Sequence, residues 1–248
     1  MSGHSKWATI KRQKGAADAK RGQLFTKLSM AISLAAKAGG ADPSMNPRLR
    51  LAIDTAKASN MPKENIDRAV KRAQLKSEGE LEETVYEGFG PGGFSIIVEA
   101  ITDNKQRTTP EVKSRIEKQG GRLGNPGSVL YQFEQRGLVT IVRDNKSIDE
   151  IFLLAADSGA VDVEEAGEDV LLYTKREELT KVRDAVTEKG LIVKNAEFIR
   201  TPLTTIYITE KDIALKALQF IEKIEELDDI QRVYANFDIS EEIAKSII

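Results

Sequence analysis

The side chains best suited to chemistry on a phosphate chain lie at the start of the sequence, in GHSKWATIKRQKG (residues 3–15). This stretch contains the only histidine and the only tryptophan of the chain. Cationic groups attract a phosphate backbone, tryptophan can stack on an unpaired base, and serine or histidine can donate to phosphate oxygens. We therefore predict nucleic-acid contacts here and in the helix that follows, at His4, Ser5, Lys6, Trp7, Lys11, Arg12, Lys14, Lys20, Arg21 and Lys27.

Trp7 also has a structural alternative. Together with Ile10 it could anchor the basic arm to the body of the protein and leave the neighbouring lysines in solvent. The two roles are compatible, because an anchored tryptophan does not prevent the cationic side chains from meeting phosphates.

The distribution of charge favours a segment that binds a polyanion. The chain of 248 residues has a formal net charge of only −2. Residues 1–76 contain 16 Lys and Arg against 5 Asp and Glu, whereas residues 77–248 contain 21 against 34. A basic segment joined to an acidic body is typical of a nucleic-acid-binding module, and the acidic part is a candidate surface for a protein partner. The alternative is that the lysine-rich helices serve only solubility.

Residues for catalysis or metal binding are scarce. The absence of cysteine excludes disulfides, thiolate nucleophiles and cysteine-based zinc sites. The single histidine, His4, has no second histidine for a metal site and no rigid frame for a Ser-His-Asp arrangement. The acidic stretch VDVEEAGEDV (161–170) lacks the spacing of a calcium loop, so we interpret it as a solvated turn, with a cation site as the alternative. We predict no enzyme activity, no cofactor, no metal and no small-molecule substrate.

Two glycine-rich stretches invite comparison with phosphate-binding loops. GFGPGGF (88–94) precedes a strand rather than a helix, and no lysine follows it until Lys105, so we interpret it as a tight turn. An enzyme that uses Gly88–Gly93 as a phosphate loop is the alternative. GGRLGNPGSV (120–129) is also interpreted as a loop, although its backbone amides could hold an anion.

The stretch TDNKQRT (102–108) joins a predicted strand to a predicted helix. Its Asp, Asn and Thr residues are typical of turns and of helix N-caps. We favour this structural role, with Lys105 and Arg107 as candidates for secondary phosphate contacts.

No part of the sequence indicates a membrane segment. The longest apolar run, IFLLAA (151–156), is far shorter than the roughly 18 residues that cross a bilayer. Lysines and an arginine interrupt the first residues, so the apolar core of a signal peptide is missing. We expect a cytoplasmic protein with no membrane partner.

Apolar spacing predicts three helices at the front of the chain. Within residues 16–38, apolar side chains recur at intervals of three and four, at Leu24, Phe25, Leu28, Ile32 and Ala35. Pro47 and Pro62 suit the first turns of two further helices. The polar run 76–84 is expected to be the linker that follows.

Beyond this linker, strands and helices alternate. The predicted elements are strand 93–102, helix 108–119 and strand 128–133, then strand 138–143, helix 147–158, strands 160–165 and 170–174, helix 178–189 and strand 191–200, and finally strand 203–209, helix 211–226 and strand 230–237. The middle group has the β, α, β, β, α, β order of a ferredoxin-like domain.

These patterns predict an α+β protein of three domains. An N-terminal three-helix domain occupies residues 1–80, and two ferredoxin-like α/β domains follow, one inserted in the other. The discontinuous domain comprises residues 81–136 plus 203–248, and the inserted domain comprises residues 137–202.

Several stretches resemble the YebC/PmpR family, whose relatives include a mitochondrial translational activator. They are GHSKWATIKRQKGAADAKRGQLFTKL, GGADPSMNPRLRLAIDTAKASNMPKENIDRA, YEGFGPGGFSIIVEAITDNKQRT and GGRLGNPGSVLYQF. The likeness weakens after about residue 137. The family's opening motif matches at Gly3, His4, Ser5, Lys6, Trp7, Ile10, Lys11 and Lys14. Gly15 stands where alanine is expected, so the first helix should begin slightly later.

The resemblance implies a helical domain and two α/β domains around a cleft, with no catalytic residue and no cofactor. Members of the family are mostly recorded as transcriptional regulators that bind DNA. Others resemble translation factors that act at the ribosome on proline-rich stretches. We therefore expect a nucleic-acid-binding regulator of gene expression, a DNA-binding transcriptional regulator of the YebC type; the alternative is a ribosome-associated translation factor that relieves stalling at such stretches.

The residues alone do not decide between duplex DNA and ribosomal RNA as the partner. No row of Arg, Asn and Gln on one helical face marks a recognition helix for the major groove. A cationic arm with one aromatic residue also suits folded RNA, in which unpaired bases are exposed.

Overall fold

The structure, a computed structural model, describes residues 18–73, 80–144, 146–240 and 242–244. Its first part is helical, with α2 (Asp18–Gly39), α3 (Pro47–Ala58) and α4 (Lys63–Arg72) packed around a small apolar core. The buried Asn46 joins the first two helices. Its side chain caps α3 by accepting from the Leu49 amide at 3.1 Å, and it donates to the carbonyls of Ala35 and Gly40, both at 2.8 Å.

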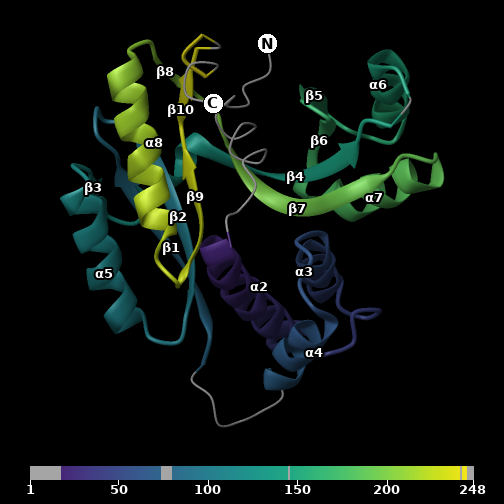
Figure 1. The fold of residues 1–248 in the computed structure, drawn as a ribbon, viewed down its shortest axis with the longest axis horizontal. Coiled ribbons are helices and arrows are strands. Elements are labelled where there is room, and N and C mark those ends of the chain that lie inside the picture. Colours follow the sequence, from purple (N-terminus) through teal and green to yellow (C-terminus); the bar gives the residue numbers. More distant parts are fainter. Residues whose placement is uncertain (1–17, 74–79, 145, 241, 245–248) are drawn as a thin grey trace.

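The first sheet has the strand order β3-β1-β2-β9 and is antiparallel throughout. Its strands are β1 (Glu82–Phe89), β2 (Ser95–Thr102), β3 (Arg122–Leu123) and β9 (Ile230–Ala235). Helices α5 (Lys105–Lys118) and α8 (Lys211–Glu225) lie side by side over one face (Figure 1). Their apolar stripes and the inward residues of β2 form the largest buried cluster of the described residues.

The second sheet has the order β5-β6-β4-β7 and is also antiparallel. It contains β4 (Phe133–Val142), β5 (Asp162–Ala166), β6 (Asp169–Lys175) and β7 (Val193–Pro202). Helices α6 (Ile148–Asp157) and α7 (Leu179–Glu188) pack with this sheet and share its core. We call the first sheet with α5 and α8 the first layer, and the second sheet with α6 and α7 the second layer. The chain order and sheet order are those of a ferredoxin-like plait, as predicted.

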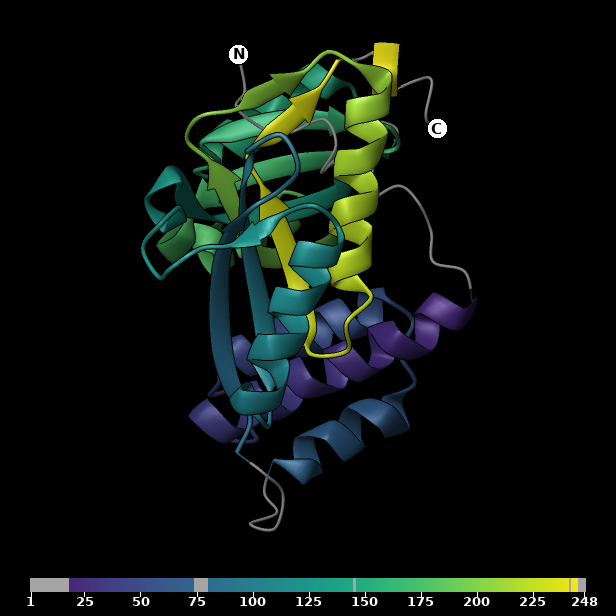
Figure 2. The ribbon, with the colours of Figure 1, turned by 90° about the vertical axis from the view of Figure 1, so that its left-hand side faces the viewer.

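The predicted fold class is confirmed, because a helical N-terminal part precedes two antiparallel α/β layers. The first layer differs from the predicted order, in which a helix separates its first two strands. Its strands β1 and β2 are joined directly by a hairpin, and β9 is the last strand of this sheet along the chain. The domain boundaries remain a prediction. In Figure 1 the three helices lie beneath both sheets, and Figure 2 shows them crossing below α5 and α8.

Several element predictions were wrong in detail. The segment 128–133 is not a strand but contains the 3₁₀ turn η1 (Leu130–Gln132), and the strand after α5 is the short β3. The predicted linker 76–84 overlaps β1, which begins at Glu82. Within 203–209, β8 (Ile206–Ile208) pairs in parallel with β10 (Phe237–Ile239) rather than with the first sheet. A second 3₁₀ turn, η2 (Arg176–Glu178), precedes α7.

Two ion pairs connect the sheets. Arg200 of β7 donates to Glu99 of β2 at 2.7 Å, and Arg232 of β9 pairs with Glu197 of β7. Burial opposes the charged form of Arg232, but Glu197, with smaller effects of Tyr234 and Glu99, raises the pKa of Arg232 above its ordinary value. The side chain of Tyr234 packs against apolar residues of both layers.

The carboxylate of Glu87 organises the loop before β4. Glu87 is buried in β1 and accepts from the backbone amides of Gly127 at 2.5 Å, Val129 at 2.7 Å and Leu130 at 2.7 Å. Burial raises the pKa of Glu87, but these three amides outweigh that effect and hold it below its ordinary value. Two of these amides belong to the stretch 120–129, which the sequence analysis interprets as a loop, and the anion that they hold is the protein's own carboxylate.

We expect Glu87→Gln to destabilise the fold by roughly 1–3 kcal/mol, because a charged acceptor of three buried amides is lost. Since the pKa of Glu87 is lowered in the folded state, its ionised form stabilises the protein above the unfolded pKa, and this contribution disappears as the pH falls through the folded pKa. Urea unfolding at neutral and acidic pH measures the difference. The exposed Glu82→Gln in the same strand is the matched control, and an equal loss in both variants would contradict the assignment.

Candidate nucleic-acid interface

Most residues predicted to contact nucleic acid lie outside the described residues. These are His4, Ser5, Lys6, Trp7, Lys11, Arg12 and Lys14. Lys20 is part of α2, but its side chain is also outside the described part of the structure. Arg21, one residue further, is exposed. These positions therefore stay predictions.

Lys27 has a different environment from the one expected. Its ammonium group is partly buried and donates to the backbone carbonyl of Glu225, at the end of α8. The structure thus places Lys27 in the contact between α2 and α8, and this geometry does not support the predicted phosphate contact.

The C-terminal end of α8 receives three side-chain donors. Besides Lys27, Gln23 of α2 donates to the Glu226 carbonyl at 3.1 Å, and Arg115 of α5 donates to the Lys223 carbonyl at 2.9 Å. The last carbonyls of a helix have no partner within the helix and carry a partial negative charge. Two of these donors come from α2, so the end of α8 is one of the places where the helical part of the chain is attached, besides the contact of α3 with the second sheet.

The TDNKQRT stretch forms the cap that the sequence predicts. Asn104 accepts from the Arg107 amide at 3.1 Å and caps α5. The Thr108 hydroxyl donates to the Asp229 carboxylate at 2.5 Å and lies 2.8 Å from the Thr102 hydroxyl. This cluster fastens the start of α5 to the loop before β9.

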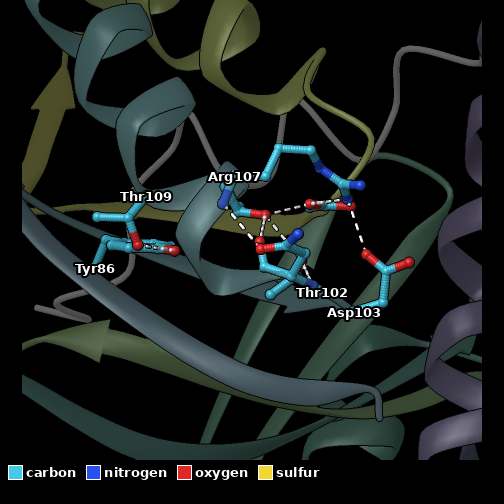
Figure 3. Close-up of polar contacts among 8 residues, drawn as sticks. Tyr86, Thr102, Asp103, Arg107 and Thr109 are labelled. Carbon is cyan, nitrogen blue, oxygen red and sulfur yellow. Dashed lines mark hydrogen bonds and ion pairs between the residues drawn. The ribbon is translucent and has the colours of Figure 1, made fainter. Parts of the chain in front are cut away.

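Arg107 joins the same cluster. It donates to Asp103 at 3.0 Å and to Asp229 at 3.2 Å, and the hydrogen bond that it donates to Asp229 raises the pKa of Arg107. Figure 3 shows Asp103 and Arg107 on the side of the purple helical ribbon, whereas Tyr86 and Thr109 lie on the other side. The hydroxyl oxygens of Tyr86 and Thr109 are 3.0 Å apart. The phosphate contact considered for Arg107 would have to compete with two carboxylates.

A cleft of about 390 Å³ separates the helical part from this cluster. We call it the arginine cleft. It is lined by α2, α4, the first turn of α5 and the loop before β9, through Phe25, Thr26, Ser29, Met30, Asn65, Arg68, Ala69, Arg72, Leu81, Asp103, Arg107 and Asp229. Residues from distant parts of the sequence therefore share one cavity.

The sequence interpretation missed part of this cleft. Neither Arg68 nor Arg72 is among the residues predicted to contact nucleic acid. Arg68 is four residues before Arg72 on α4, and this spacing places both on one helical face. The spacing was a usable signal, but nothing in the sequence indicated which surface would lie opposite.

The two glycine-rich stretches act as turns. In the hairpin between β1 and β2, Gly92 and Gly93 have φ of +83° and +87°, which favour glycine over other residues. The predicted tight turn at 88–94 is confirmed.

Among the described residues, no group of acidic or histidine side chains is arranged to hold a metal ion. None of the described helices is long and apolar enough to cross a membrane.

Comparison with known proteins shows a match along nearly the whole chain. The model described as "TACO1/YebC protein N-terminal domain" matches residues 5–76, and the one described as "TACO1/YebC second and third domain" matches residues 81–237. The chain is 50% identical to a "probable transcriptional regulatory protein" of Chloroflexus aggregans, over 99% of this chain and 98% of that protein. It is 45% identical to one of Sulfurihydrogenibium sp., over 100% and 99%.

A solved structure gives the same fold. The crystal structure of a conserved hypothetical protein from Aquifex aeolicus superposes with a TM-score of 0.84 at 41% identity. The match covers 90% of this chain and 93% of that chain.

We expect Lys27→Met to lower the free energy of unfolding by about 1–2 kcal/mol, because it removes a partly buried cation from the end of α8. Lys63→Met, an exposed lysine in the first turn of α4, should change it by less than about 0.5 kcal/mol. Denaturant unfolding of both variants makes the comparison. Equal stability of the two would show that the contact between Lys27 and α8 contributes nothing.

Proposed function

This chain belongs to the TACO1/YebC family, and on that premise we propose that it is a nucleic-acid-binding regulator of gene expression, of the transcriptional type for which its bacterial relatives are named. The observation that carries the proposal is the division of charge. The family's N-terminal domain, matched over residues 5–76, coincides with the basic part of the chain. We assign no catalytic step to the protein.

In this proposal, the basic arm before α2 and the exposed cations of the helical part hold a phosphate backbone. Each neutralised phosphate releases condensed counterions, so affinity should depend strongly on salt. The acidic α/β layers stay clear of the polyanion and are available to a protein partner.

The placement of α3 bears on the type of nucleic acid. Arg48 at its start pairs with Glu83, and Asp54 pairs with Arg183 of α7 at 3.6 Å. Leu51 of the same helix is buried in the core of the second sheet layer. Packed in this way, α3 cannot enter a major groove as a recognition helix.

This packing favours a second candidate function. Folded RNA offers phosphates and unpaired bases that a protein can bind without placing a helix in a major groove. A ribosome-associated translation factor that relieves stalling at proline-rich stretches is therefore the runner-up to a DNA-binding transcriptional regulator.

We expect duplex DNA binding to weaken with salt at a log–log slope of roughly −5, for about six neutralised phosphates. The charge-reversed Lys11/Arg12/Lys14→Glu variant should fold normally and lose this binding. Reversal of the exposed Lys175, Lys181 and Lys189 in the second layer is the matched control and should have little effect. A slope near zero, or equal losses in both variants, would contradict the electrostatic basis of the proposal.

Sedimentation in a cell lysate whose DNA has been removed with a nuclease separates the two candidates. A translation factor should migrate with ribosomal particles at low salt, and the Lys11/Arg12/Lys14→Glu variant should not. A transcriptional regulator should stay in the light fractions and shift duplex DNA in a separate binding assay.

A further inference from the structure

We propose that the arginine cleft binds one unpaired nucleotide of the nucleic acid that the basic segment holds. This inference rests on the proposed function and adds the class of ligand that the protein recognises. The cleft has arginines for the phosphate, apolar side chains for the face of the base, and polar side chains for the edge of the base.

The phosphate side is formed by α4. Arg68 and Arg72 both line the cleft, and Arg68 is exposed with no ion-pair partner among the described residues. A guanidinium group can donate two parallel hydrogen bonds to phosphate oxygens and is always charged. The arginines project from a helix, so their spacing is set by rigid backbone.

The base side is formed by apolar residues of α2 and the start of the first sheet layer. Phe25, Met30 and Leu81 line the cleft together. An aromatic ring or a thioether gives a flat base an apolar surface to stack on, and every base can use such a surface. These apolar residues line the same cleft as the arginines. One nucleotide could therefore place its base against them and its phosphate against α4.

Polar groups that can meet the edge of a base complete the cleft. Asn65 has both a donor and an acceptor, and the Asp103 carboxylate can accept from an exocyclic amino group. Arg107 pairs with Asp103 at 3.0 Å and with Asp229 at 3.2 Å, so this side of the cleft keeps a net negative charge and the phosphate is expected on the side of α4. The two sides of the cleft therefore offer different chemistry, cationic on α4 and accepting on the loop before α5.

The size of the cleft selects an unpaired base. Its volume of about 390 Å³ is in the range of sites for small ligands, which suits a single nucleotide and not a length of duplex. A paired base would first have to leave the stack, which costs free energy that an unpaired base does not require. We therefore infer preference for bulges and loops over continuous duplex.

The test compares a short duplex that carries one central unpaired adenosine with the same duplex fully paired, in RNA and in DNA. Fluorescence anisotropy with the full-length protein gives the affinity for each. We expect the bulged form of at least one sugar type to bind about tenfold more tightly than its paired form. An abasic residue in the bulge should remove most of this preference, because the phosphates remain but the base is lost.

Arg68→Gln and Lys63→Gln remove the same charge from the same helix, but only Arg68 lines the cleft. Both should weaken binding to every probe, whereas only Arg68→Gln should reduce the preference for the bulge, to about twofold or less. Phe25→Leu, which keeps an apolar residue in the packed position, should also reduce the preference.

Equal affinity for bulged and paired probes, or equal preference in Arg68→Gln and Lys63→Gln, would overturn the inference and leave the proposed function standing. Absence of binding to every probe at low salt would overturn both.

Discussion

The helical part of this protein is held by two contacts: Leu51 of α3 lies in the core of the second sheet, and side chains of α2 reach the last carbonyls of α8. Those of Lys223, Glu225 and Glu226 receive donors from side chains instead of from the helix itself. These contacts are partly buried or exposed, so each is expected to contribute roughly 0.5–1.5 kcal/mol, somewhat more where the donor is charged. Because two of the donors belong to α2, this helix end helps to fix where α2 packs, together with the burial of α3.

The arginine cleft follows from this contact. Once α2 is held at the end of α8, α4 faces the loop that carries Asp229, and that loop is itself fastened to α5 by Thr108 and Arg107. Hydrogen bonds from Thr108 and Arg107 to Asp229 therefore hold one side of the cleft, while α2 and α4 form the other side. A wall that is already ordered lowers the free-energy cost of binding a ligand.

The sequence allowed the helices and the ferredoxin-like order to be predicted because both depend on local periodicity. The stripe of α8 and the cap at Asn104 are written in neighbouring residues. The error at 128–133 has a long-range cause: this segment has strand-like composition, but the Glu87 carboxylate, more than 40 positions earlier, binds the amides of Val129 and Leu130. The two-residue β3 is too short to give any periodic signal.

The same limit applies to the site. Lys27 looks like any surface lysine, and only the fold shows that its partner is nearly 200 positions away. Arg68 lies on an ordinary amphipathic helix and Asp103 in a loop, and only the packing of the helical part against the first sheet brings them to one cleft. Periodicity identifies which side of a helix is polar, but it does not identify what that side will face.

The excess of positive charge in the helical part consequently has two uses. Some of these cations form contacts within the protein. Lys27 donates to the end of α8, Lys37 pairs with Glu80 at 3.5 Å, and Arg48 pairs with Glu83. These contacts attach a basic unit to an acidic body, and they weaken the field available to a phosphate chain. A polyanion must therefore be attracted by the cations left over, of which Lys63, Arg68 and Lys71 of α4 are exposed. The same cations serve attachment within the protein and attraction of a polyanion. For a substitution that reverses one of these charges, both the stability of the fold and the affinity for nucleic acid should therefore be measured.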